Sequence, residues 1–182
     1  MAMKTGRQNK IFSMLNLENS LPDQVFNKPF QYFRFMEVDL VFSEAFGCSV
    51  LSWIDAENSD SLRIGKIVES SSCVDQIRQL NPGSSGTDYV NLLRDGGPDQ
   101  GWFYDMGTYA IASDTGRWCV YCERYNEVAV LGLDEQSFVR FSDQLTSLPV
   151  QRIEEMVSNK IYPFDCLTPR WNSRLIQNYR SI

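Results

Sequence analysis

The chain has 182 residues, of which 43% are hydrophobic and 13% aromatic, a composition that suits one folded domain rather than a disordered polymer. Its 17 Lys and Arg and 23 Asp and Glu give a net charge of −6, which argues against nucleic acid as a partner. The chain contains no histidine, so Ser-His-Asp triads, Cys-His nucleophiles, HExxH proteases and zinc sites with histidine ligands are excluded.

The sequence also predicts a compartment. No apolar run approaches the roughly 20 residues that span a bilayer, so we expect no membrane segment. The N-terminus lacks the apolar core of a secretory signal, and five scattered cysteines, an odd number, favour reduced thiols over disulfides. We therefore predict a cytoplasmic protein with a single globular domain over residues 1–182, whose first residues, roughly ten, are flexible.

The N-terminal segments predict short helices and a strand. Residues 9–17 fit a short helix or an approach segment. Leu21-Pro-Asp predicts a turn into a short helix that must break near Pro29. The aromatic-rich segment 30–42 ends in alternation of apolar and charged residues, which predicts a strand.

The next three segments predict a hairpin and a helix. Residues 48–55 and 62–68 are strand candidates, and the polar turn between them favours pairing as a hairpin. Residues 72–80 carry apolar side chains at helical spacing and are followed by Asn81-Pro-Gly, so they predict a short helix.

The second half of the chain predicts a sheet followed by helices. Residues 81–101 fit a long loop around a short helix at 89–93. Tight turns then join three predicted strands, 108–112, 117–122 and 127–131, into an antiparallel meander. Helices are predicted over 135–145 with Asp134 as the cap, after Pro149, and from Thr168-Pro169. The predicted fold class is α+β, an antiparallel β-sheet (meander) with helices packed on one face.

Cys119 and Cys122 have the spacing of redox and zinc-binding motifs, but their context favours a structural role. On a strand their side chains point to opposite faces, and their Cα atoms lie about 10 Å apart. A disulfide needs Cα atoms within about 7 Å, and a zinc site needs a second ligand pair that the other cysteines do not form. We expect Trp118, Val120 and Cys122 on one face of a central strand, with Cys119 and Tyr121 on the other.

Other candidate sites lack part of what their chemistry requires. Residues 55–60 begin like a calcium loop, but Asp60 replaces the required glycine and Lys66 the bidentate glutamate. The Gly-rich segment 95–101 lacks the Gly-Lys-Ser/Thr of a phosphate-binding loop. Glu37 and Asp39 could form a catalytic carboxylate pair, although acids on the solvent side of an edge strand are far commoner. We therefore assign no catalytic, metal-binding or cofactor-binding residue.

The distribution of acids suggests a protein-binding surface. Between Phe35 and Leu62 the chain has six acidic residues and no Lys or Arg, so this part could steer a basic partner; an ordinary solvated surface is the alternative. Aromatic residues at 102–104 stand beside acids and could anchor an interface. The candidate partner-binding residues are Glu37, Asp39, Asp55, Glu57, Asp60, Trp102, Tyr104 and Asp105.

The C-terminal half resembles a known class of proteins. Trp118-Cys-Val-Tyr, Glu127-Val-Ala-Val-Leu and the acid-capped Ser137-Phe-Val-Arg-Phe-Ser-Asp-Gln-Leu145 are similar to the β-meander and Ser-Phe-x-x-Phe helix of SUKH-superfamily immunity proteins. Contact-dependent-inhibition immunity proteins are an equally good comparison. The resemblance covers roughly residues 102–148. It implies a non-catalytic cytoplasmic protein that binds and neutralises a cognate toxin, and it identifies no site residues. The acids of segment 37–60 make a basic toxin domain the expected partner.

A rival hypothesis is a small-molecule-binding protein or a hydrolase. It would use carboxylates such as Asp99 and Asp105 near the Gly-rich 95–105 loop. A deep, carboxylate-lined pocket would favour this reading, whereas a flat or shallow acidic face would favour a protein-binding domain. The sequence leaves the oligomeric state open.

Overall fold

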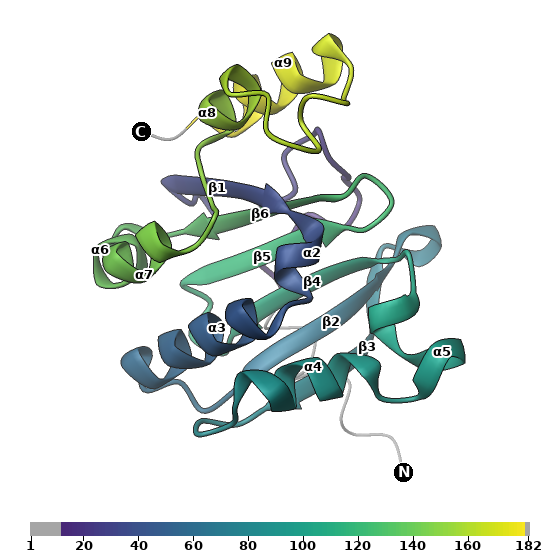
Figure 1. Cartoon of the computed structure of the whole chain (residues 1–182), viewed down its shortest axis with the longest axis vertical. Coiled ribbons are helices and arrows are strands. Elements are labelled where there is room, and N and C mark those ends of the chain that lie inside the picture. The colour runs from purple at the N-terminus through teal and green to yellow at the C-terminus, as the bar shows by residue number, and fades with distance from the viewer. Residues whose placement is uncertain (1–11, 181–182) are drawn as a thin grey trace.

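The computed structural model describes residues 12–180, which form a six-stranded antiparallel sheet flanked by helices (Figure 1). The strands are β1 (Tyr32–Glu37), β2 (Leu62–Val68), β3 (Cys73–Leu80), β4 (Thr108–Ser113), β5 (Trp118–Glu123) and β6 (Val128–Leu133). The helices are α2 (Val38–Val41), α3 (Glu44–Glu57), α4 (Gly86–Arg94), α5 (Gly97–Gln100), α6 (Glu135–Arg140), α7 (Ser142–Ser147), α8 (Ile153–Ser158) and α9 (Pro169–Asn178), with 3-10 turns η1 (Glu69–Ser71) and η2 (Trp102–Tyr104). The predicted flexible start and residues 9–11 of the predicted 9–17 segment lie outside the described residues. Residues 12–17 form turns and an isolated bridge between Leu15 and Phe26, and they contain no helix.

The predicted α+β class and the β4–β5–β6 meander are confirmed. The strand order is β1-β6-β5-β4-β2-β3, and every neighbouring pair is antiparallel. At one edge, β1 is extended by Gln151, whose amide and carbonyl exchange hydrogen bonds with those of Phe35 at 3.1 and 2.7 Å. None of the helices in the described part of the chain is long and apolar enough to cross a bilayer.

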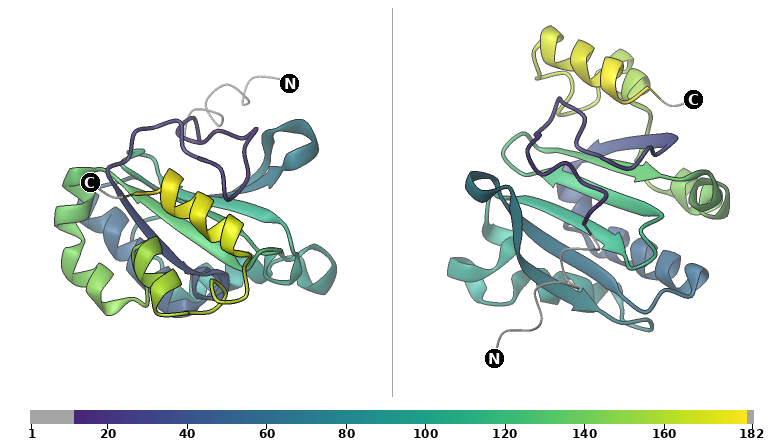
Figure 2. Two further views of the ribbon diagram at one scale, coloured as in Figure 1. Left: turned by 90° about the horizontal axis from the view of Figure 1, so that it is seen from above. Right: turned by 180° about the vertical axis from the view of Figure 1, so that it is seen from behind.

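Helices cover both faces of the sheet rather than one. On the first face, α3 and α4 pack over a cluster in which Trp53 stacks on Phe141 and meets Trp118 edge-on, with ring centroids 5.1 and 5.3 Å apart. On the second face, α8, α9 and the segment 12–30 cover a cluster that includes Phe35 and Tyr179. Figure 2 shows this N-terminal segment crossing the sheet on the side opposite α3.

The central strand β5 is buried on both faces, as its sequence predicts. Trp118, Val120 and Cys122 belong to the cluster on the first face, and Cys119 and Tyr121 to that on the second. Burial raises the pKa of the Cys122 thiol to about 12 and also raises the pKa of Cys119 far above its ordinary value. Both thiols are therefore protonated and unreactive in the folded protein.

The predicted strand over 48–55 is wrong, because these residues lie in α3. Ser43 caps this helix by accepting a hydrogen bond from the Phe46 amide at 3.2 Å, and Asn58 ends it in the left-handed conformation with φ 53°. The buried residues Phe46, Val50, Trp53 and Ile54 have the spacing of one helical face. The predicted hairpin between 48–55 and β2 is consequently wrong as well.

The predicted helix over 72–80 is also wrong, because residues 73–80 form β3. This strand pairs with β2 in a hairpin that places Leu62 opposite Leu80. Its apolar residues fit a helical spacing, but pairing with the open edge of β2 decides the conformation. The turn between the strands contains η1 and Ser72, whose φ is 46°.

Three further predictions differ in detail. The segment before Pro29 is irregular rather than helical; its backbone amides at Leu21 and Val25 donate to the Glu123 carboxylate and the Tyr179 hydroxyl at 2.7 and 2.9 Å. The predicted strand 30–42 ends at Glu37 and is followed by α2. The predicted helix 135–145 is divided at Phe141 into α6 and α7.

The burial of β5 predicts the order in which thiols react. We expect iodoacetamide to label the exposed Cys48 and Cys166 in the native protein, whereas Cys119 and Cys122 react only after unfolding. Peptide mapping by mass spectrometry with and without denaturant would measure this. Native labelling of Cys119 or Cys122 as fast as that of Cys48 would contradict a doubly covered central strand.

Candidate functional site

The register of the sheet brings several predicted site residues to one end. Glu37 lies at the end of β1 opposite Val128, which pairs with Glu123, and Glu123 pairs with Thr108 at the start of β4. The β5–β6 turn and the loop leading into β4 therefore lie beside the end of β1, on the right of Figure 1. Residues far apart in the sequence form one surface here.

We call this surface the acidic rim and define it by four carboxylates and four exposed large side chains. Its members are Glu37, Asp39, Asp105, Glu127, Tyr104, Met106, Tyr125 and Tyr162. Tyr125, at the tip of the β5–β6 turn, is 83% exposed, and Met106 is 57% exposed. The Tyr162 hydroxyl donates a hydrogen bond to the Glu127 carboxylate, which ties the loop after α8 to the rim.

The carboxylates at the β1 end of the rim repel one another. Partial burial, followed by the negative charges of Asp39 and Glu127, raises the pKa of the Glu37 carboxyl. The Oδ1 atom of Asp39 lies 3.9 Å from Nη2 of Arg124, which is a long ion pair, and the Asp39 side chain is largely exposed. This part of the rim therefore presents a concentrated negative field to solvent.

Arg124 connects the segments that form the rim. Its guanidinium lies 4.3 Å from the ring centroid of Phe42, and its Nη1 donates to the Phe103 carbonyl at 2.6 Å. These contacts hold α2, η2 and the β5–β6 turn in fixed positions. Arg124 and Glu127 are not among the residues that the sequence pattern singles out, although the turn Glu123-Arg-Tyr-Asn-Glu127 carries three charged residues.

Asp105 is the member of the rim whose charge is compensated. Partial burial acts to raise the pKa of its carboxyl, but a hydrogen bond from Lys66 and the charge of that ammonium act in the opposite direction, and the pKa is lowered. The pair fixes the loop before β4 to β2. Asp105 therefore contributes more to the shape of the rim than to its field.

The other predicted site residues lie elsewhere. Trp102 is buried, with Arg78 4.3 Å above its ring, so its side chain does not contribute to the surface. Asp55, Glu57 and Asp60 lie at the opposite end of the sheet, because Leu62 pairs with Ser113 there.

Glu57 has a structural role at that far end. Its carboxylate accepts hydrogen bonds from the hydroxyls of Ser113 at 2.9 Å, Thr115 at 2.9 Å and Ser137 at 3.2 Å. Ser113 and Ser137 are fully buried, so these bonds satisfy polar groups that water does not reach. Glu57 thus joins α3 to the β4–β5 turn and to α6.

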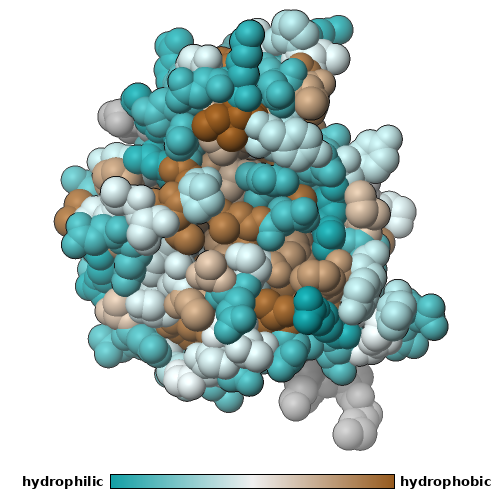
Figure 3. Space-filling model, viewed as in Figure 1, coloured by the Kyte–Doolittle hydropathy of each residue, from teal (hydrophilic) through white to brown (hydrophobic). Residues whose placement is uncertain are grey.

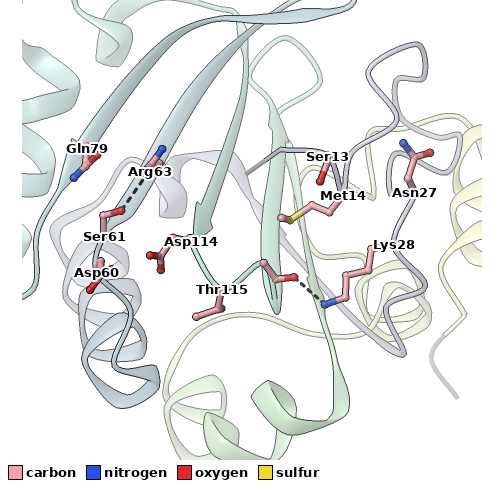
Figure 4. A pocket seen from close by; sticks show the side chains of 11 residues that line it. Ser13, Met14, Asn27, Lys28, Asp60, Ser61, Arg63, Gln79, Asp114 and Thr115 are labelled. Atoms are coloured by element: carbon pink, nitrogen blue, oxygen red, sulfur yellow. Dashed lines mark hydrogen bonds between the residues drawn. The ribbon is translucent and has the colours of Figure 1, made fainter. Parts of the chain in front are cut away.

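A hollow of about 890 Å³ also lies at the far end, between the loops there and the N-terminal segment (Figure 4). Its charged lining consists of Asp60 and Asp114 together with Lys28 and Arg63. Lys28 donates to the Gly116 carbonyl at 2.8 Å, so this cation is part of the wall. The hollow is thus lined by two acidic and two basic side chains, and the lining charges are balanced.

The carboxylates near the Gly-rich loop do not form a pair. Asp99 is exposed on α5, and Asp105 is held by Lys66. A crevice of about 560 Å³ nearby has Arg94 and Arg124 stacked on Phe103 and Phe42, with centroid distances of 4.5 and 4.3 Å. Among the described residues, no group of three His, Cys, Asp or Glu side chains is placed to hold a metal ion.

Comparison with protein-family models, curated proteins and solved structures found no match for this chain. The proposal for the function is therefore based on the geometry of the acidic rim.

The network at Glu57 predicts a stability defect without a binding defect. Glu57→Ala would leave the buried Ser137 hydroxyl without its acceptor and remove one of the two partners of the buried Ser113 hydroxyl, which costs about 1–3 kcal/mol of unfolding free energy. Urea denaturation followed by tryptophan fluorescence would measure the loss. The exposed neighbour Asp55→Ala is the matched control and should change stability little; equal losses in the two variants would contradict the structural role.

Proposed function

We propose that this chain is a non-catalytic cytoplasmic protein-binding domain that binds a basic partner on the acidic rim. The partner is a protein of the kind that immunity proteins neutralise, a basic toxin domain. The observation that carries the proposal is that Glu37 lies within electrostatic reach of Asp39 and Glu127, at the end of the sheet where Tyr125 and Met106 are exposed.

The composition of the rim supports a protein partner. Exposed aromatic side chains and methionine are enriched in protein interfaces, where they act as anchors surrounded by polar groups. Partial burial, followed by repulsion from Asp39 and Glu127, raises the pKa of Glu37; a cationic partner would relieve the repulsion, and the negative field would accelerate its approach. By contrast, Figure 3 shows apolar residues on the face covered by α3 and α4 as small patches divided by hydrophilic ones.

The second candidate function is the binding of a small molecule beside the Gly-rich 95–105 loop. The crevice lined by Arg94, Phe103 and Arg124 supports it. One of its two carboxylates is engaged, because Glu44 accepts a hydrogen bond from Thr87 at 2.7 Å. A hydrolase would need a free acid and base there, so the acidic rim is the better supported site.

Two variants with matched charge test the proposal. The rim variant, Glu37→Gln with Asp39→Asn and Glu127→Gln, should weaken binding of a basic partner at least about tenfold, mainly through slower association. The control, Asp55→Asn with Asp60→Asn and Glu135→Gln, removes the same charge elsewhere and should bind normally. Calorimetry and stopped-flow kinetics with the basic protein encoded beside this chain would measure both.

Two results would contradict the proposal that the acidic rim is the docking surface. Equal weakening in both variants would mean that only net charge matters, and unchanged binding in the rim variant would remove the rim as the docking surface. Toxicity assays in cells that produce the partner would show whether loss of binding is accompanied by loss of neutralisation.

A further inference from the structure

Arg63 lies at the base of the hollow at the far end of the sheet. It belongs to the second face of β2, because its neighbours Leu62 and Ile64 pack into the cluster on the first face. Across the sheet it stands opposite Gln79 of β3 and the small side chain of Ala112 of β4. The volume of about 890 Å³ lies within the range of roughly 300–1,000 Å³ that small-molecule sites have.

The guanidinium of Arg63 is open to a ligand. Its Nε donates a hydrogen bond to the Ser61 hydroxyl at 3.3 Å, as Figure 4 shows. Within residues 12–180, neither Nη1 nor Nη2 has a hydrogen-bond or ion-pair partner. Lys28, across the hollow, already donates to the Gly116 carbonyl. Arg63 is thus the cation that can offer two parallel N–H groups to an entering carboxylate.

The hollow also contains negative charge that is separate from Arg63. The Asp114 carboxylate accepts a hydrogen bond from the Ser59 hydroxyl through Oδ1, but Oδ2 has no partner in the described part of the chain, and the residue is exposed. Asp60 is exposed as well. In residues 12–180 neither acid forms an ion pair with Arg63. Opposite charges that line one hollow without neutralising each other suit a ligand that carries both signs.

Two amide side chains in the lining offer further acceptors. The Nδ2 of Asn27 donates to the Leu15 carbonyl at 2.8 Å, and the Nε2 of Gln79 donates to the Asn81 side chain at 3.2 Å. The side-chain oxygens of Asn27 and Gln79 accept no hydrogen bond from the described residues. These oxygens suit a neutral donor, such as an amide or a hydroxyl group.

We propose that the hollow binds a free α-amino acid with a polar, uncharged side chain. The Nη atoms of Arg63 bind its carboxylate, and the Asp114 carboxylate binds its ammonium group. The oxygens of Asn27 and Gln79 accept hydrogen bonds from its side chain. This site lies at the end of the sheet opposite the acidic rim and goes beyond the proposed function.

The test uses L-glutamine as the probe. In two-dimensional amide NMR spectra of the full chain, it should cause saturable shifts at Ser61, Gln79 and Gly116, but none at Gly107 or Asn126 on the rim side. N-acetyl-L-glutamine lacks the ammonium group and L-glutaminamide lacks the carboxylate. Each analogue should bind at least about tenfold more weakly than L-glutamine, because each loses one of the two charge-assisted contacts.

Two variants with matched controls assign these contacts to residues. Arg63→Gln and Asp114→Asn should each weaken L-glutamine binding at least about tenfold, and the new Asn side chain can still accept from Ser59. Arg170→Gln on α9 and Asp99→Asn on α5 remove the same charges at exposed sites outside the hollow and should bind as the parent does. If Arg63→Gln perturbs folding, Asp114→Asn and the two analogues still decide the outcome.

Three results would overturn the assignment. The first is the absence of saturable shifts when L-glutamine is added to the parent protein. The second is equal affinity for L-glutamine and its two analogues, which would show that the charges are not read. The third is unchanged affinity in folded Arg63→Gln or Asp114→Asn, which would place the ligand elsewhere.

Discussion

The structure depends on the burial of both faces of one sheet. Every residue of β4, β5 and β6 is buried, so two separate apolar layers must be covered at once. Helices α3 and α4 cover one layer, and α8, α9 and the N-terminal segment cover the other. Polar side chains in these strands are confined to the strand ends, where Thr108 and Glu123 lie at one end and Ser113 at the other.

This constraint also determines where function can reside. The faces of the sheet are occupied by the core, and the exposed chemistry lies at its two ends. At the far end the carboxylate of Glu57 is used to satisfy buried hydroxyls, and opposite charges line the hollow beside Asp60. At the rim the carboxylates of Glu37, Asp39 and Glu127 are close together and face solvent beside exposed aromatic rings. The two ends are therefore chemically different.

The sequence was most informative where pairing is local. The meander, the two faces of Cys119 and Cys122 and the position of α9 follow from short strands, tight turns and an N-terminal Pro, all of which act between neighbours. The predictions for segments 48–55 and 72–80 are wrong because the spacing of their apolar residues fits both a helix and a strand. Ser43 and Phe46 were the signal for α3, whereas β3 depends on the edge of β2, which no local pattern reveals.

The candidate site could be predicted only in part for a related reason. The acids between 37 and 60 are neighbours in sequence, but α3 separates them by about 20 Å along its axis. Arg124 and Glu127 lie beside the end of β1 through the register of β1 with β6 and of β6 with β5, and the first of these pairs distant segments. Trp102 was expected at the surface, yet it fills the core beneath Arg78. The sequence thus indicates the residue types of the candidate surface, acids beside aromatics, but not which of these residues lie together in the fold.

Amide hydrogen exchange of the chain, with and without a basic partner, tests whether the acidic rim is the docking surface. We expect slower exchange in the complex at residues 37–39, 104–107 and 124–127, and unchanged exchange at 55–60 and 114–116. Protection confined to 55–60 and 114–116, with the rim unaffected, would contradict it.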